Sequence, residues 1–317
     1  MAIYDKFQKD LLANISGPSY IGNPKNNTMM YLTKKIEMKL SLLNDCQGCL
    51  IFLEANINVP ETIVINNSVV FCENPVKEYT EVAAELYQQI LDDNQKRLYK
   101  NVNGLYYIGE NVKLGQNVVI EPGAFIDHDV TIGNNSLIKA GAVIRYGSVL
   151  GERCTICENA VIGDPAFNTA RYEDGTIELV PSFGNVVIGY NVYIGANTIV
   201  SRGSADNTIL EDHVKIDSNI RVGHDVHLHK CVELLGSAAV AGYCEIGENT
   251  VVASNATLKN RLIVGRDCYI GMGSVVHHNV KDGLTMSGSP AKSMNQIGRQ
   301  RLLEVQMKEL VRKHNNK

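Results

Sequence analysis

The sequence has no excess of positive charge and no long apolar run, and each absence excludes a class of protein. Its 30 Lys and Arg residues stand against 34 Asp and Glu, a formal net charge of −4, which argues against nucleic acid as the main partner. The first ten residues lack the apolar segment that follows a basic patch in a secretory signal. No apolar run approaches the ~20 residues that cross a bilayer as a helix. We therefore expect a cytoplasmic protein with no membrane span.

The sequence has instead an aliphatic residue at every sixth position. The count holds without a miss from Ile108 to Ile162 and again from Leu210 to Val276. A small or β-branched residue usually follows four positions later, and Gly often follows one position later. A hexad supplies one short strand and one corner, neither of which can bury its apolar edge alone. The repeat therefore predicts a solenoid whose stacked coils share one core.

Three hexads that close a triangular coil would place residues eighteen apart directly above one another, at ~4.8 Å. The period does not set the hand of the coil, and strand crossovers are normally right-handed. The pattern resembles that of hexapeptide-repeat acyltransferases, and this resemblance implies a left-handed parallel β-helix.

The repeat divides the chain into three predicted domains. Residues 1–100 lack it and mix helical with strand periodicity, which predicts a small α+β domain. Residues 101–281 carry it and form the predicted left-handed β-helix. Residues 282–317 lie beyond it and are predicted as a helical tail, with a helix from Ile297 to Lys313. The predicted fold is mainly β, and 317 residues are enough for several domains.

Within the first domain, apolar residues at helical spacing predict a helix between Ile3 and Ile15. Cys49–Leu53 and Thr62–Cys72 are predicted strands. An amphipathic helix is predicted to begin after Pro75.

Two segments outside the hexads are candidates for contacts with other molecules. Pro and Gly residues interrupt the repeat between Asp164 and Asn185, so this segment is predicted to leave the solenoid as a loop. The loop could contact substrate, or it could be a surface loop without a function in binding. The tail carries seven Lys or Arg from Pro290 onward, against Glu304 and Glu309. This excess of positive charge favours binding to an acidic partner, or is that of a solvent-exposed helix that caps the solenoid.

The eight cysteines do not form a convincing metal set. A structural zinc site needs four converging ligands, and the pairs Cys46/Cys49 and Cys154/Cys157 offer two each. Three cysteines fall on the small inward position of the hexad, where they are expected to fill the core; these are Cys154, Cys244 and Cys268.

His224 is the best candidate for proton transfer, because histidine exchanges protons near neutral pH. It lies two residues after the aliphatic Val222, at a corner, and is expected to point out of the core. The eighteen-residue ladder places Gly242 one coil above it, where a Gly N–H can approach a reacting carbonyl. From the residues alone, the alternative that His224 is a surface residue at a corner with no catalytic role is equally well supported.

Two other chemistries are disfavoured. γ-Class carbonic anhydrases share this solenoid and hold zinc with a histidine pair spaced like His224 and His229, plus an upstream histidine. Here the preceding coil offers only His213, at the wrong corner, so we predict no metal site. No G-x-S-x-G elbow occurs, which disfavours a Ser/His/Asp hydrolase.

The run from Gly184 to Asp225 is specific enough to suggest a family. It contains Asn-Val-Tyr-Ile-Gly-Ala-Asn and Ile-Asp-Ser-Asn-Ile-Arg-Val-Gly-His, and the pattern continues through Ala-Val-Ala-Gly242. This stretch resembles the UDP-3-O-acylglucosamine N-acyltransferases of lipid A synthesis. The resemblance implies that His224 is the general base, that Asp217 supports it, and that Gly242 supplies the N–H for the oxyanion.

The amino-terminal domain carries a weaker resemblance to the same family. Tyr20-Ile-Gly-Asn23-Pro-Lys25 resembles its F-L-x-N-P-K element, which implies that Tyr20 and Asn23, with Lys25, hold a uracil base. The chain departs from the family at Asn26, where a second aromatic is expected, and at Arg261, where the family has a further histidine. We retain Arg261 as a substrate-binding candidate.

The resemblance implies an acyltransferase that moves an acyl group from acyl-ACP or acyl-CoA to the amine of a UDP-linked amino sugar. It implies a homotrimer with sites between neighbouring subunits, and no metal or redox cofactor. The segment from Met286 to Lys292 looks more like CoA-dependent acetyltransferases, so an acetyl-CoA-dependent N-acetyltransferase of a capsule or O-antigen pathway is an alternative. A non-catalytic solenoid scaffold is a third.

Overall fold

The computed structural model describes residues 12 and 14–315. The helix predicted between Ile3 and Ile15 lies mostly outside these residues. The described residues separate into two compact units. The hexad count is broken within 165–185 and again within 202–207, and both of these segments group with the first unit. The amino-terminal unit comprises the described part of Met1–Leu98 with Pro165–Asn185 and Arg202–Asn207, and the solenoid unit comprises Tyr99–Asp164, Val186–Ser201 and the described part of Thr208–Lys317.

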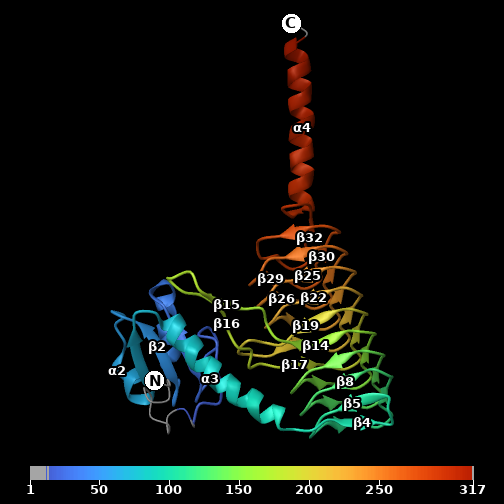
Figure 1. Cartoon of the computed structure of the whole chain (residues 1–317). Helices are drawn as coiled ribbons and strands as arrows, with labels where there is room; N and C mark the ends of the chain where they lie inside the picture. Colours follow the sequence, from blue (N-terminus) through green and yellow to red (C-terminus); the bar gives the residue numbers. More distant parts are fainter. Residues whose placement is uncertain (1–11, 13, 316–317) are drawn as a thin grey trace. The chain divides into compact units, whose positions relative to one another are not determined.

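A parallel sheet is the centre of the amino-terminal unit, with its strands in the order β1, β2, β3 (Figure 1). They are β1 (Met29–Leu32), β2 (Leu50–Glu54) and β3 (Ser68–Cys72). The central strand β2 is buried from Leu50 to Leu53, as expected for a parallel strand covered on both faces. The strand predicted over Cys49–Leu53 is thus confirmed.

The strand predicted over Thr62–Cys72 is wrong in its first half. The chain there forms helix α2 (Glu61–Asn66) before β3 begins. Pro60 and an acidic residue in the first turn favour a helix start. Ile63 is the helix residue that is buried. The β-branched residues of this segment therefore form a short helix that buries one side chain, and β-propensity alone does not distinguish such a segment from a strand.

Helix α3 (Pro75–Gln95) begins where predicted. Oδ1 of Asn74 accepts a hydrogen bond from the backbone N–H of Lys77 at 3.0 Å, and Pro75 takes the first helical position, which needs no N–H. The inward face of α3 packs on the sheet through Tyr79 and Val82. The remaining elements of this unit are η2 (Lys34–Leu43) and, in the predicted loop, the hairpin of β15 (Thr169–Arg171) and β16 (Ile177–Leu179).

Three long sheets make up the faces of the described solenoid, and they are parallel except at their ends (Figure 1). The first face contains β4 (Lys100–Val102), β5 (Tyr106–Ile108), β8 (Phe125–Ile126), β11 (Val143–Ile144), β14 (Val161–Asp164), β19 (Ile199–Ser201), β22 (Arg221–Val222), β25 (Ala239–Val240), β28 (Thr257–Leu258) and β31 (Val275–Val276). The second face contains β6 (Lys113–Leu114), β9 (Thr131–Ile132), β12 (Val149–Leu150), β17 (Val186–Ile188), β20 (Thr208–Leu210), β23 (His227–Leu228), β26 (Glu245–Ile246) and β29 (Ile263–Val264). The third face contains β7 (Val119–Ile120), β10 (Leu137–Ile138), β13 (Thr155–Ile156), β18 (Tyr193–Ile194), β21 (Lys215–Ile216), β24 (Glu233–Leu234), β27 (Val251–Val252), β30 (Tyr269–Ile270), β32 (Thr285–Ser287) and β33 (Lys292–Ser293).

Residues eighteen apart pair in register along these faces, which confirms the predicted ladder. Val222 pairs with Val240, and Val240 pairs with Leu258. The spacing widens only where the hexads are interrupted: Leu150 pairs with Ile188, and Ile188 pairs with Leu210. The periodic aliphatics therefore form one continuous core.

The inward cysteines behave as predicted. Cys154, Cys244 and Cys268 are buried in the solenoid, and all eight cysteines are free thiols. Burial is the main cause that raises the pKa of the Cys154 and Cys244 thiols above their ordinary value, which disfavours the thiolate needed for metal binding. Cys157, the partner of Cys154 in the second cysteine pair, is buried as well, beside Tyr193 of the next coil.

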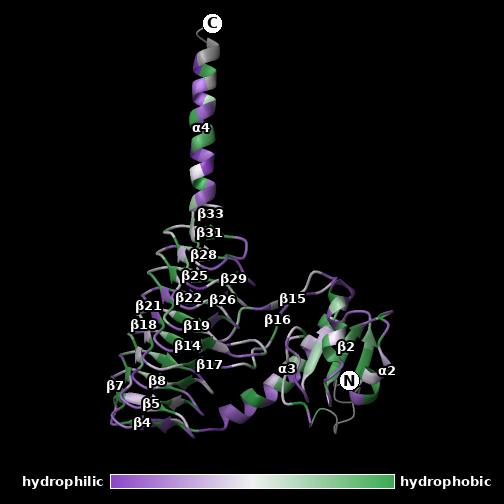
Figure 2. Cartoon of the chain, turned by 180° about the vertical axis from the view of Figure 1, so that it is seen from behind, coloured by the Kyte–Doolittle hydropathy of each residue, from purple (hydrophilic) through white to green (hydrophobic). Residues whose placement is uncertain are grey.

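Helix α4 (Met294–Asn315) confirms the predicted terminal helix and follows β33 at the end of the coil stack (Figure 1). Hydrophobic and hydrophilic residues alternate along it (Figure 2), and several of its apolar side chains are exposed. These include Leu302, Leu303, Val305, Met307 and Val311. In the described part of the chain, no helix is both long and apolar enough to cross a membrane.

Candidate active site

His224 lies at the corner that follows β22 and leads into β23, and its side chain is mostly covered. Its Nδ1 lies 2.7 Å from Oδ2 of Asp225, with the two side chains 17% and 5% exposed. The backbone N–H of Asp225 donates to Oγ1 of the buried Thr208 at 2.9 Å. A carboxylate accepts hydrogen bonds, so this contact calls for a proton on Nδ1, and in the neutral ring the lone pair then lies on Nε2. This is the tautomer that a general base requires.

Gly242 lies one coil above His224, as the ladder predicted. A Cβ built on Gly242 would stand 2.6 Å from Nε2 and 2.7 Å from Cε1 of the imidazole, so the ring packs directly against the glycine. The φ of Gly242 is not positive, and it is this close approach rather than backbone strain that requires glycine. Any side chain here would displace the ring.

The backbone N–H of Gly242 has no acceptor among the described residues. At the same position of other hexads, two after the aliphatic, this N–H donates to a side-chain oxygen: Tyr190 to Asp212 at 2.8 Å, and Lys230 to Glu211 at 3.1 Å. The donor beside Nε2 of His224 is therefore available to a substrate oxygen, which suits the oxyanion role.

Tyr243 and Arg261 continue the column above Asp225, at corner positions eighteen residues apart. All three have positive φ, between 55° and 63°, and most other corners of this kind carry Asn or Asp, which adopt such angles more readily. The Tyr243 ring packs edge-on to His224 at 5.0 Å, and the Arg261 guanidinium lies 4.3 Å from the Tyr243 centroid. Bulky residues in this strained conformation at one place point to function.

Asp217, the predicted support for His224, lies elsewhere. It follows β21 on the third face, and its carboxylate accepts the backbone N–H groups of Ser218 at 2.7 Å and Gly236 at 3.1 Å. The carboxylate in contact with His224 is that of Asp225, which the sequence interpretation missed although it is the next residue. A catalytic role for Asp217 stays a prediction.

In the amino-terminal unit, two of the three predicted base-binding residues meet at Asp206. Nδ2 of Asn23 lies 3.4 Å from Oδ2 of Asp206, and Nζ of Lys25 pairs with Oδ1. Tyr20 lies in the same tight turn, since Asn23 N–H donates to its carbonyl at 2.8 Å. Nζ of Lys39 lies 4.6 Å from the centroid of the Tyr20 ring and 2.6 Å from its hydroxyl. Asp206 and Lys39 lie too far along the chain from this turn for local patterns to reveal them.

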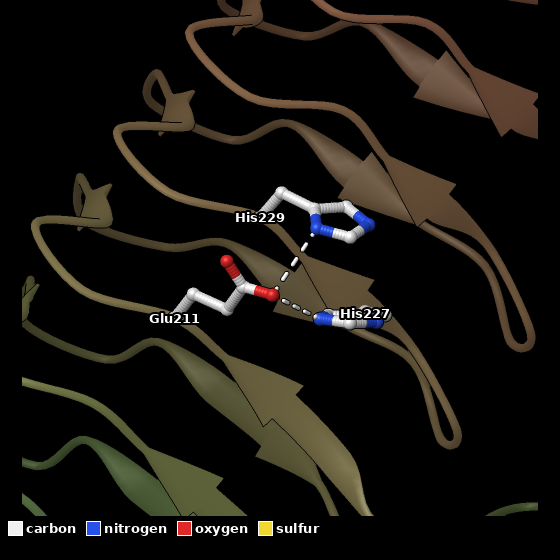
Figure 3. Close-up of side chains that lie close together, drawn as sticks. All are labelled: Glu211, His227 and His229. Carbon is white, nitrogen blue, oxygen red and sulfur yellow. Dashed lines mark hydrogen bonds and ion pairs between the residues drawn. The ribbon is translucent and has the colours of Figure 1, made fainter.

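One group of side chains among the described residues has the spacing of metal ligands, and it does not include His224. Glu211, His227 and His229 each offer a ligand atom within 4.8 Å of the others (Figure 3). The sequence prediction of no metal site considered His224 and His229 and did not consider this group.

Comparisons with known proteins agree with the geometry of the solenoid. Residues 129–164 match the bacterial transferase hexapeptide family (six repeats). A probable mitochondrial UDP-3-O-acylglucosamine N-acyltransferase 2 of Arabidopsis thaliana is 31% identical over 147 residues, 46% of this chain and 48% of that protein. A UDP-3-O-acylglucosamine N-acyltransferase of Herminiimonas arsenicoxydans is 36% identical over 129 residues, 39% of this chain and 35% of that protein. The matched stretch thus spans less than half the length of these relatives.

Solved structures give the same fold. A UDP-N-acetylglucosamine acyltransferase of Bacteroides fragilis superimposes with a TM-score of 0.55 at 27% identity, over 63% of this chain and 77% of that one. One from Campylobacter jejuni gives 0.53 at 27% identity, over 60% of this chain and 73% of that one. The predicted left-handed parallel β-helix is confirmed.

Proposed function

We propose that this chain is an N-acyltransferase that moves an acyl group from a thioester carrier to the amine of a UDP-linked amino sugar, in lipid A or surface-polysaccharide synthesis. The observation that carries the proposal is His224, held through Nδ1 by Asp225 and packed through Nε2 against Gly242. The similar proteins support the class of acceptor, since their names place their activity on UDP-linked glucosamine derivatives.

In the proposed reaction, Nε2 of His224 accepts a proton from the sugar amine as its nitrogen attacks the thioester carbonyl. The C–N bond forms, and the carbonyl oxygen becomes an oxyanion to which the Gly242 N–H donates. The C–S bond then breaks, and the proton passes from His224 to the leaving sulfur. Asp225, 2.7 Å from Nδ1, stabilises the imidazolium between these steps. No step calls for a metal or a redox cofactor.

The substrate contacts are proposed for the remaining predicted residues. The ring of Tyr20 offers a stacking surface for the uracil base. Asn23 and Lys25 offer hydrogen-bond donors for the base, and Asp206 orients both side chains by binding them. Arg261, stacked on Tyr243 beside His224, brings a positive charge close to the reacting groups, where phosphates of either substrate carry negative charge.

A homotrimer in the cytoplasm is the proposed working form. Apolar side chains are exposed on the solenoid faces, and a second copy would cover them; they include Leu114, Val119, Val149, Ile263 and Tyr269. Sedimentation equilibrium measures this directly: three chains per particle are expected, and a monomer at micromolar concentration would contradict the proposal.

The decisive experiment is an activity panel. Purified protein is incubated with acyl-CoA and acyl-ACP donors of increasing chain length and with UDP- and dTDP-linked amino sugars, and products are identified by mass spectrometry. Transfer of a long acyl chain from acyl-ACP to a UDP-amino sugar supports the proposal. Activity with acetyl-CoA alone would assign the chain instead to an N-acetyltransferase. The absence of transfer with every pair would favour a non-catalytic scaffold.

A further inference from the structure

We propose that Glu211, His227 and His229 form a binding site for one divalent transition-metal ion such as Zn²⁺, separate from the transfer site. Two imidazoles and one carboxylate are donors that such ions favour. The proposal rests on the positions of these side chains on the second face of the solenoid. It does not depend on the acyltransferase activity.

The register of the coils brings the three residues together. His227 begins β23 and His229 directly follows it; the two flank the inward Leu228, so both point outward on the same side of the coil. Ile209 pairs with His227 and Leu210 with Leu228, which places Glu211 one coil below His229. The two imidazole rings stack with centroids 4.0 Å apart and planes at 25°.

The nitrogens of both rings converge on one oxygen of Glu211 (Figure 3). Nε2 of His227 lies 2.8 Å and Nδ1 of His229 lies 3.1 Å from Oε1. Around a tetrahedral zinc with bonds of about 2.0–2.1 Å, neighbouring ligand atoms stand ~3.3 Å apart. The two nitrogen-to-oxygen distances are close to that separation, and all three ligand atoms lie within 4.8 Å of one another, so small side-chain adjustments would place them around one ion. Each side chain is about one-third exposed, at 29–33%, so an ion has access and a water can complete its coordination.

Two further contacts are those expected around a metal site. The other ring nitrogen of His229, Nε2, lies 3.0 Å from Oε1 of Glu245, and a ligating histidine usually donates its second N–H to a carboxylate in this way. The second oxygen of Glu211, Oε2, accepts the Lys230 N–H at 3.1 Å, which orients the carboxylate. Both contacts fix the direction of a ligand before an ion arrives.

A hydrogen-bond network without an ion is the competing account. It places one carboxylate oxygen between two imidazoles, and each bond then needs a proton on the ring nitrogen that faces Glu211. The geometry favours the ion. Nε2 of His229 faces Glu245 at 3.0 Å while its Nδ1 faces Glu211 at 3.1 Å, so one nitrogen can donate to a carboxylate while the other offers its lone pair to a metal.

The test is a metal titration of the full-length protein after removal of bound metal with a chelator and dialysis. Zn²⁺ binding is followed by calorimetry, and bound zinc is counted by mass spectrometry after gel filtration. We expect one ion per chain with a micromolar or tighter Kd. We expect the double variant His227→Ala/His229→Ala to bind at least ~100-fold more weakly, and Glu245→Gln ~10- to 100-fold more weakly.

The matched control removes two histidines elsewhere. His277 and His278 are exposed residues at another corner of the solenoid, and His277→Ala/His278→Ala should keep the wild-type affinity. Glu211→Gln, which keeps the size of the side chain, provides a second reading if the double alanine variant fails to fold, as judged by circular dichroism of the metal-free proteins. It should bind at least ~10-fold more weakly, since a neutral amide is a poorer ligand.

Co²⁺ as a probe reports the geometry, because the intense visible band of four-coordinate Co²⁺ should appear with wild type and be absent from the double variant. The proposal is overturned if wild type binds Zn²⁺ no more tightly than ~1 mM. It is equally overturned if His227→Ala/His229→Ala, folded, binds with wild-type affinity.

Discussion

Gly242→Ala changes one hydrogen for a methyl group at the point where the proposed base meets the proposed oxyanion donor. The new Cβ would lie 2.6 Å from Nε2, 2.7 Å from Cε1 and 3.0 Å from Cδ2 of His224. Non-bonded carbon and nitrogen atoms settle at about 3.5 Å or more, so the imidazole must withdraw by roughly 1 Å. The backbone tolerates alanine, since φ is not positive at this residue.

A displacement of this size is expected to lower kcat about 100-fold, which corresponds to about 2.7 kcal/mol of activation free energy. The free energy of unfolding should change little, by about 1 kcal/mol, because the ring is the flexible end of a side chain and rotates towards solvent. A large loss of rate with a small shift of Tm is the expected signature.

The assay follows product by mass spectrometry under saturating donor and acceptor, with Tm from circular dichroism. Gly298→Ala is the matched control, because a Cβ there meets nothing within 4 Å and the residue lies in α4, away from His224. It should keep the wild-type rate.

A double-mutant cycle separates the imidazole from the N–H. If the clash with the ring is the cause, Gly242→Ala should cost less than ~3-fold when introduced into His224→Ala, since the ring is then gone. A full 100-fold loss in that background would show that displacement of His224 is not the reason. A wild-type rate in the single variant would refute the assignment of the site.

Further outcomes follow from other contacts. His224→Ala should lower kcat about 100-fold or more with no change of Tm beyond a few degrees, and a wild-type rate would remove the general base. Asp225→Asn, measured as a pH–rate profile, should lower the rate ~10-fold or more, because the amide can donate to Nδ1 and so favours the tautomer with a proton on Nε2; an unchanged profile would contradict the supporting role. Lys25→Ala should raise KM for the nucleotide sugar ~10-fold at constant kcat, and a fall in kcat alone would argue against ground-state binding. Burial raises the pKa of Cys154 and Cys244 in the folded state, so the stability they contribute is complete below the ordinary thiol pKa of 9.0 and is lost as the pH rises above it. Urea midpoints at pH 8 and pH 10 should therefore differ less in a Cys154→Ala/Cys244→Ala variant than in wild type, and an equal difference would contradict this account.

The position of His224 relative to Gly242 was predictable because a regular repeat converts sequence distance into spatial distance. Each coil takes eighteen residues, and strand pairing sets the rise between coils, so the ladder needs no knowledge of side chains. The same ladder puts Glu211 below His229, which the sequence interpretation missed because it looked for histidines alone. It fails across the interruptions, where Ile188 pairs with Leu210, since the length of an inserted loop follows no period.

The sequence by itself determined the solenoid, its inward cysteines, the terminal helix and the corner that carries His224, because all of these depend on which residues recur at fixed spacing. Only the tertiary structure decided that Asp225 rather than Asp217 contacts the imidazole, that Tyr243 and Arg261 stack beside it, and that Lys25 meets Asp206. These contacts depend on side-chain rotamers at corners and on where an irregular segment ends. Such choices are made by packing between coils, and the period of the sequence carries no record of them.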